Sequence, residues 1–151
     1  MSDAAIRDAA IQGMIDELAV RRVLDVYCLR LEANHFDEWL ELFTEDSIYE
    51  VYKLTLRGHE GIREVLSKAP HGTHIGGPAR ITITGDHAET FQNYLFVATN
   101  ADEWNVGWYD RTLMRTANGW KISHTRVKIG RKDSLPVNER AGKIAYPISF
   151  G

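Results

Sequence analysis

The sequence predicts an α+β domain in which N-terminal helices cover one face of a curved, mostly antiparallel sheet. Three observations lead to this fold class. Helical periodicity is confined to the first 70 residues, four strand-like runs follow in succession, and hairpin-type turns separate those runs. Strands joined by short turns pair antiparallel, and helices that precede them cover the sheet on one side. Such a sheet encloses a pocket against its helices.

The expected helices are recognised by apolar residues on one face. The first runs from residue 16 to about residue 34, where apolar residues recur at spacings of 4, 3 and 4, namely Val20, Leu24, Tyr27 and Leu31. A second, short helix fits "FDEWLELF" (36–43), and a third fits "GHEGIREVLSKA" (58–69), which stops before Pro70. Between them, "SIYEVYKLTL" (47–56) predicts one strand, because it is rich in β-branched and aromatic residues.

Four further strands are expected in a meander. They span residues 72–84, 87–99, 104–117 and 119–130, separated by the turn sequences "GD", "NADE" and "ANG". Trp39 and Trp120 are expected in the core, since a large curved sheet uses tryptophan to fill its interior.

The C-terminal stretch "RKDSLPVNERAGKIAYPISFG" holds two prolines and no sustained period, which predicts an irregular tail. Its apolar residues are expected to pack on the mouth of the pocket or on a neighbouring subunit; they are Ile144, Tyr146, Ile148 and Phe150.

Composition limits the class of protein. A chain of 151 residues with 44% hydrophobic and 26% charged residues is expected to form one globular domain over 1–151. Net charge is −3 and the basic residues are dispersed, so nucleic acid is not an expected partner. The single Cys28 excludes an intrachain disulfide. The N-terminus has neither a signal pattern nor a membrane span, so a cytoplasmic location without membrane contact is expected.

The stretch "HGTHIGGPARITI" (71–83) holds the strongest candidate for chemistry, His74. In a regular strand, His74 faces away from Ile81 and Ile83, which belong to the core face. A bulge at Gly76-Gly77-Pro78 would reverse the facing and aim His74 into a pocket; a plain strand is the alternative. No metal site is expected, because neither a His-Glu-x-x-His motif nor a Cys/His cluster accompanies these histidines.

Three segments carry a family resemblance: "VLDVYCLRLEANHFDEWLELFTEDSIYEVY", "THIGGPARITITGDHAETF" and "GWYDRTLMRTANGWKISHTRV". Together they resemble the SnoaL-like branch of the nuclear-transport-factor-2-like superfamily over about residues 15–130. Members include scytalone dehydratase, bile acid 7α-dehydratase, ketosteroid isomerase relatives, hexachlorocyclohexane dehydrochlorinase and the small (β) subunits of ring-hydroxylating dioxygenases. The resemblance implies a cone-shaped, cystatin-like fold with a pocket, and it specifies the fold more closely than the reaction.

The resemblance also implies catalytic residues. In the dehydratases a histidine in a "TQHFIGG"-like stretch is the general base, and His74 matches it; a strand-start histidine bonded to backbone is the alternative. Tyr27 and Glu32 hold the spacing of that group's tyrosine and carboxylate. Tyr27 is equally compatible with a core role, and Glu32 with an exposed helix end, since five residues turn a helix by about 140°. His71 has no counterpart in the family and is expected in solvent.

Further side chains are expected to line the pocket and bind substrate. Tyr49 and Tyr52 are candidate hydrogen-bond donors on the first strand. The later strands add Asn93, Tyr94, Trp108, His124 and Arg126. Strand alternation puts His124 and Arg126 on one side, with Trp120, while leaving open whether that side is the pocket.

The function expected from these residues is a cofactor-free lyase or isomerase that acts on a small hydrophobic cyclic or polycyclic carbonyl or hydroxyl compound. The sequence has no phosphate loop, dinucleotide fingerprint or Gly-x-Ser-x-Gly elbow. His74 would remove a proton and a tyrosine would donate to the oxygen that gains charge. The alternatives are a structural dioxygenase small subunit, which would bind a large subunit, and a non-catalytic binding protein.

A homo-oligomer, a dimer or trimer, is also expected. Residues 90–99 and 104–114 carry apolar side chains on both alternation sets, and helices cover only one face of the sheet. A second copy would cover the outer face.

Overall fold

The computed structural model describes residues 1–32, 35–99 and 103–134, with only the backbone described for Glu32 and for residues 131–134. In chain order its elements are α1 (Asp3–Glu32), α2 (Phe36–Leu40), β1 (Phe43–Val51), β2 (Leu54–Arg57), α3 (Gly58–Leu66), β3 (Gly72–Thr84), β4 (His87–Ala98), β5 (Glu103–Thr116) and β6 (Gly119–Ser134). Helices before a run of strands confirm the predicted α+β class.

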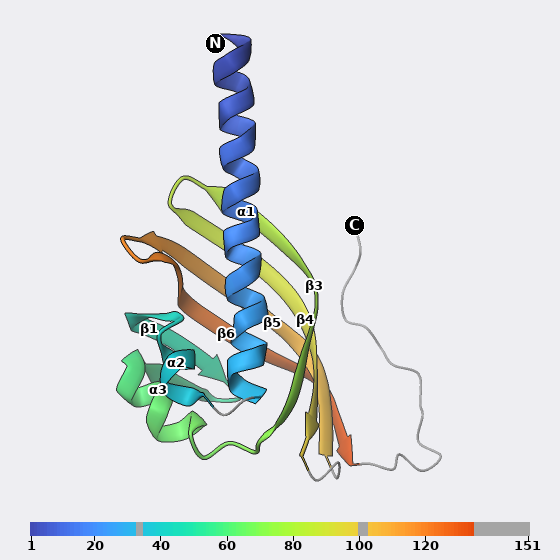
Figure 1. Cartoon of the computed structure of the whole chain (residues 1–151). Coiled ribbons are helices and arrows are strands. Elements are labelled where there is room, and N and C mark those ends of the chain that lie inside the picture. The colour runs from blue at the N-terminus through green and yellow to red at the C-terminus, as the bar shows by residue number, and fades with distance from the viewer. Residues whose placement is uncertain (33–34, 100–102, 135–151) are drawn as a thin grey trace.

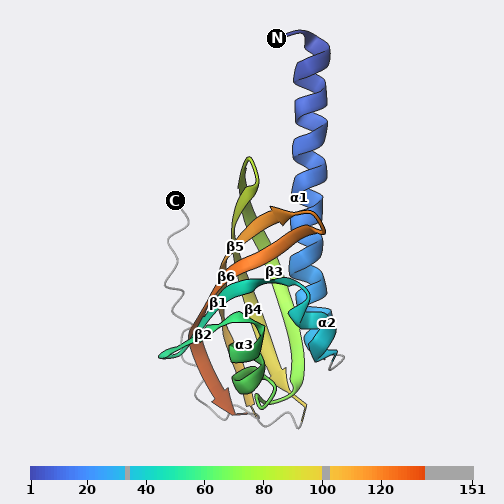
Figure 2. The ribbon, with the colours of Figure 1, turned by 90° about the vertical axis from the view of Figure 1, so that its left-hand side faces the viewer.

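The strands form one sheet in the order β2-β1-β6-β5-β4-β3. Neighbouring strands are antiparallel, except that β1 and β6 are parallel. The sheet is curved, with α1 lying across one face and α2 and α3 lying close to β1 (Figures 1 and 2). The predicted meander of β3 to β6 is therefore confirmed, and its concave face has a helical cover.

Helix α1 begins thirteen residues before the predicted start at Asp16, since it starts at Asp3. The hydroxyl oxygen of Ser2 accepts a hydrogen bond from the backbone N–H of Ala5 (3.3 Å), which caps the helix. Residues 3–15 are exposed and project beyond the sheet (Figure 1). The apolar period thus marked where the helix meets the sheet, not where it begins. None of the described helices is long and apolar enough to cross a membrane.

The single strand predicted over 47–56 is a hairpin of two strands. β1 pairs antiparallel with β2 and Val51 lies opposite Leu54, so Tyr52 and Lys53 form the turn. Tyr52 has a φ of 54°, in the left-handed region that a bulky residue rarely adopts. The sequence contains no glycine at this turn, which is why its pattern did not predict one.

The predicted bulge in β3 is confirmed. Gly76 lies opposite Tyr94 and Ala79 lies opposite Gln92, so β3 holds one residue more than β4 across this stretch. A Cβ added at Gly77 would lie 2.0 Å from Asn93 Oδ1, so any larger residue here would require the Asn93 side chain to move. The extra residue reverses the facing of the strand.

The core lies between α1, α2 and the concave face of the sheet. Both tryptophans predicted to be buried are buried, with Trp39 0% and Trp120 7% exposed. The ring centroid of Trp39 lies 5.2 Å from that of Tyr27 and 4.7 Å from that of Phe43. Aromatic rings therefore hold the end of α1 against α2 and the start of β1.

β6 continues to Ser134, four residues into the stretch predicted as an irregular tail. It pairs with β5 along its length, with Glu103 opposite Ser134. The remainder of that prediction, including the packing of Ile144, Tyr146, Ile148 and Phe150, lies outside the described residues.

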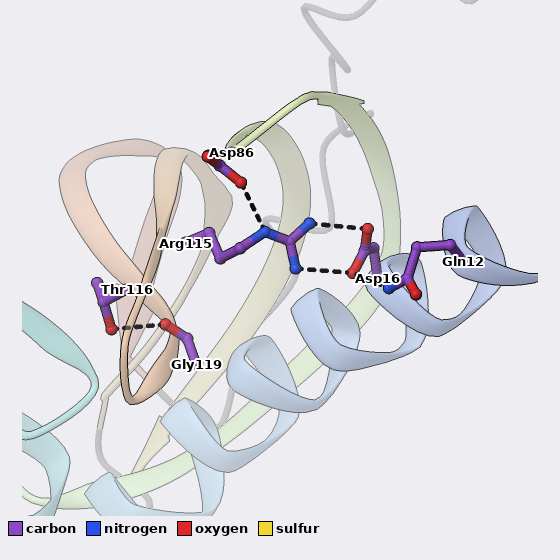
Figure 3. Close-up of polar contacts among 6 residues, drawn as sticks. All are labelled: Gln12, Asp16, Asp86, Arg115, Thr116 and Gly119. Carbon is purple, nitrogen blue, oxygen red and sulfur yellow. Dashed lines mark hydrogen bonds and ion pairs between the residues drawn. The ribbon is translucent and has the colours of Figure 1, made fainter. Parts of the chain in front are cut away.

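Arg115 joins α1 to two parts of the sheet. Its guanidinium forms a bidentate pair with Asp16 (Nη1 to Oδ1, 3.0 Å; Nη2 to Oδ2, 2.8 Å), and its Nε donates to Asp86 at 2.7 Å (Figure 3). Gln12 donates a further hydrogen bond to Asp16. The hydrogen bond from Arg115 holds the pKa of Asp16 below its ordinary value, so the carboxylate stays ionised.

We predict that Asp16→Asn lowers the melting temperature by a few degrees at pH 7, because it removes the anion from a bidentate pair. A carboxyl whose pKa is lowered by folding stabilises the fold above its unfolded pKa, and this contribution is lost as pH falls through the lowered value. The difference between wild type and variant in thermal melts should therefore shrink below pH about 4.

Asp37→Asn is the matched control. It breaks the pair between Asp37 and Arg63, in which both side chains are at least half exposed, and such pairs contribute little. An Asp16→Asn variant that melts like Asp37→Asn at pH 7, or whose deficit is the same at every pH, would contradict the prediction.

Candidate functional site

A cavity of about 860 Å³ lies between the concave face of the sheet and the helices. Its walls come from the end of α1, from α2, from the β1–β2 hairpin, from the end of α3 with the segment that follows it, and from β3 to β6. Apolar and aromatic side chains predominate, and the volume is that of a pocket for a small organic molecule. The cavity is the expected pocket.

His74 lies on the wall of this cavity. The bulge after Gly76 puts it on the same face of the sheet as its partner Phe96, with ring centroids 4.7 Å apart, while Ile75 points outward and is 54% exposed. Its Nδ1 is buried without a hydrogen-bond partner. Burial lowers the pKa of His74 to about 4, although the nearby backbone of Gly72 acts in the opposite direction. The imidazole is therefore neutral at pH 7 and able to accept a proton.

Tyr27 and Tyr49 form a hydroxyl pair in the same wall, with 2.8 Å between their oxygens. Tyr27 is fully buried and Tyr49 nearly so. Burial raises the pKa of each phenol, so both remain protonated at pH 7. One hydroxyl donates to the other, which leaves one O–H to donate to a ligand oxygen.

Two further predicted lining residues, Tyr52 and Tyr94, also border the cavity. Tyr52 is 70% exposed and stands at the rim, on the β1–β2 turn. Tyr94 is buried, and its hydroxyl donates to Asn105 Oδ1 at 2.7 Å. His71, expected in solvent, is exposed but lies on the rim.

Four predicted substrate-binding residues do not line the cavity: Asn93, Trp108, His124 and Arg126. Asn93 and Trp108 are opposite each other on β4 and β5, at positions that alternate with the buried Gln92 and Tyr109. They therefore face away from the helices.

His124 and Arg126 face outward because β6 holds an extra residue. Ile122 lies opposite Leu113 while His124 lies opposite Thr112, so alternation reverses at Ser123. His124 and Arg126 instead contact Glu50, at 2.6 Å and 3.1 Å. Sequence alternation grouped them with the buried Trp120, since nothing in "GWKISHTRV" marks a bulge as glycine and proline do in β3.

Glu32, the third predicted catalytic residue, is the last residue of α1, and its side chain lies outside the described part. Its role stays a prediction. Among the residues whose side chains the structure describes, no three of His, Cys, Asp and Glu form a group that could hold a metal ion.

Sequence reasoning missed Tyr109, Asn105 and Arg111. Tyr109 lies on the cavity wall with its ring 5.3 Å from that of Tyr27. Arg111 is fully buried behind both rings. Tyr109, Arg111 and the buried Leu113 alternate along β5. This alternation is visible in the sequence, but the charged Arg111 within it suggests that these side chains face solvent.

Comparison with solved structures gives the same fold for several proteins. A single-residue variant of Rv3472 of Mycobacterium tuberculosis, a protein of unknown function, is 22% identical with a TM-score of 0.73, covering 81% of this chain and 76% of that one. A candidate scytalone dehydratase from Novosphingobium aromaticivorans is 18% identical with a TM-score of 0.76, and the match covers 94% of this chain and 99% of that one. The LinA type 2 hexachlorocyclohexane dehydrochlorinase is 13% identical with a TM-score of 0.74, and the match covers 91% of this chain and 98% of that one.

A further structural neighbour from Novosphingobium aromaticivorans, 20% identical with a TM-score of 0.76 over 85% of this chain and 91% of that one, is described as NTF2-like with a cystatin-like fold. No curated protein matches the sequence. The model of the SnoaL-like domain family matches residues 12–126, which include α1 from Gln12 and the sheet as far as Arg126. With this match over most of its length and with that fold, the chain belongs to the SnoaL-like domain family.

Proposed function

We propose that this chain is a cofactor-free lyase or isomerase that acts on a small hydrophobic cyclic or polycyclic compound with a carbonyl or hydroxyl group. The observation that carries the proposal is His74, a neutral imidazole in the wall of a largely apolar cavity. Two structural neighbours are named as a dehydratase and a dehydrochlorinase, and both names denote elimination reactions, which supports the proposal of a lyase.

The residues present suit elimination of water from a β-hydroxy ketone. His74 takes a proton from the carbon beside the carbonyl, and the C–H electron pair forms an enolate. Tyr27 or Tyr49 donates a hydrogen bond to the enolate oxygen. The carbonyl re-forms as the bond from the β-carbon to its hydroxyl breaks, and the hydroxyl leaves as water with the proton held by His74. Isomerisation uses the same first step and returns the proton to another carbon.

The low pKa of His74 has two consequences for this chemistry. The imidazole is unprotonated over the whole physiological range, so the base is always available. Its protonated form is a stronger acid than ordinary imidazolium, which favours delivery of the proton to the leaving hydroxyl. Burial thus favours the second half of the elimination at the expense of basicity in the first.

We predict that His74→Gln lowers turnover about 10²- to 10⁴-fold, since glutamine keeps the size of the side chain but cannot act as a base. The assay is formation of a conjugated enone, followed by ultraviolet absorbance, from a panel of cyclic β-hydroxy ketones. His124→Gln is the matched control, because His124 lies on the outer face and should leave turnover unchanged. Near-full turnover by His74→Gln would remove His74 from the mechanism.

We also predict that kcat/KM of the wild type holds level as pH falls from 7 and declines only near pH 4. The lowered pKa of His74, about 4, sets this limb, because protonation removes the base. An acid limb near the ordinary histidine value of about 6.5 would contradict the role of burial. The pH profile of kcat/KM, measured with the best substrate of the panel, distinguishes an acid limb near pH 4 from one near the ordinary histidine value.

The competing function is that of a dioxygenase small subunit. A candidate aromatic ring hydroxylase from Novosphingobium aromaticivorans has the same fold, at 23% identity and a TM-score of 0.69. Such a subunit would turn over no compound of the panel and would copurify with a Rieske-type large subunit. A chain that binds panel compounds without turnover and without that partner would be a binding protein.

The chain is further proposed to act as a homo-oligomer, most simply a dimer formed through the outer face of the sheet. That face carries the partly exposed residues Phe91, Leu95, Val97 and Trp108 beside the exposed Ile75, and an apolar sheet face needs a cover. Light scattering at micromolar concentration should give at least twice the mass of the chain. A monomer at that concentration would refute this expectation.

A further inference from the structure

Arg111 occupies an unusual place for a cation. It lies in the middle of β5 on the concave face and is 0% exposed. Its Cζ lies 4.0 Å from the ring centroid of Tyr27 and 3.8 Å from that of Tyr109, so the guanidinium contacts two rings that line the cavity. Nη1 donates to Gln92 Oε1 at 3.2 Å. These contacts hold the positive charge directly behind the inner wall of the cavity.

This charge is incompletely compensated. Nε and Nη2 of Arg111 are buried without hydrogen-bond partners, and no carboxylate in the described part of the chain forms an ion pair with it. Two aromatic rings and one amide oxygen compensate a buried cation only in part. An apolar side chain of similar length would fill the same space without the cost of desolvation. The packing of the core therefore does not explain an arginine here.

The charge acts on the polar groups that face the cavity. Arg111 acts to lower the pKa of Tyr27, Tyr49 and Tyr109, against the larger effect of burial, and it also disfavours the protonated form of His74. A cation at this place makes a tyrosine hydroxyl a stronger hydrogen-bond donor and favours negative charge on whatever accepts that bond. The Tyr27–Tyr49 hydroxyl pair is one such donor, and Arg111 contacts the ring of Tyr27.

We propose that Arg111 is a positioning residue whose fixed positive charge, relayed through the Tyr27–Tyr49 hydroxyl pair, makes the inner end of the cavity selective for a ligand oxygen that carries or gains negative charge. The ligand class is a phenolate or an enolate rather than a neutral ether or alcohol. The inference rests on the proposed function, because it concerns the same cavity, but its test measures binding and needs no turnover. Near-full turnover by His74→Gln, which would overturn the role proposed for His74, would leave this inference untouched.

The test uses 4-nitrophenol, whose absorption band differs between its neutral and ionised forms, and 4-nitroanisole, its methyl ether, which cannot ionise. Wild-type protein should bind nitrophenol, and the bound phenol should ionise at a pH lower than the free phenol by about one unit or more. Absorbance titration of nitrophenol with and without excess protein measures the shift. No binding at millimolar nitrophenol, or a shift to higher pH, would overturn the proposal.

Substitutions separate the charge from the shape of the cavity. Arg111→Gln should abolish the shift and weaken nitrophenolate binding about tenfold, while nitroanisole affinity stays within about threefold of wild type. Arg111→Lys, which keeps the charge, should keep most of the shift. Arg126→Gln, on the outer face, is the matched control and should behave as wild type.

The same shift in Arg111→Gln as in wild type, or an equal loss of nitroanisole and nitrophenolate binding, would show that Arg111 only supports the packing of the core. If Arg111→Gln does not fold, as judged by thermal melting, the wild-type titration and Arg111→Lys decide: a folded Arg111→Lys that has lost the shift would refute the electrostatic role.

Discussion

One extra residue in a strand decides what the cavity of this protein contains. Side chains in a strand alternate between its two faces, and a bulge reverses that alternation. In β3 the bulge at Gly76-Gly77-Pro78 lets His74 and the apolar Ile81 share the concave face. In β6 the extra residue at Ser123 sends His124 to the opposite face. With two regular strands, the two histidines would have changed places relative to the cavity.

Desolvation then sets the protonation states of the groups that the bulges bring inside. Burial disfavours charge, so His74 is neutral and Tyr27 and Tyr49 are protonated, which gives one acceptor and a donor pair in one cavity. Arg111 is the exception, because a guanidinium cannot be neutralised in this way. The cavity wall therefore combines uncharged acid–base groups with one fixed positive charge behind them.

The helical cover is held at two levels. Near the cavity, aromatic contacts of Tyr27 with Trp39 and Tyr109 fix the end of α1 over the sheet. Farther along the helix, the Arg115–Asp16 pair ties α1 to the strand end that also binds Asp86 (Figure 3). The residues of α1 before Asp16 are exposed. The part of α1 from Asp16 onward therefore packs on the sheet and positions Tyr27.

Local signals in the sequence were enough to predict the class of fold, the meander of β3 to β6 and the bulge that places His74. Those signals are the apolar period, the turn residues and a Gly-Gly-Pro break. The strand pattern also indicated Tyr49, Tyr52 and Tyr94 of the cavity wall, and the family resemblance indicated Tyr27, whereas Tyr109 was missed.

Other features became visible only in the folded chain: the outward facing of His124 and Arg126, the burial of Arg111 behind two tyrosines, and the pairing of Arg115 with Asp16. The first depends on a bulge that no glycine or proline marks. The other two depend on contacts between residues far apart in the chain, and such contacts leave no local pattern from which they could be predicted.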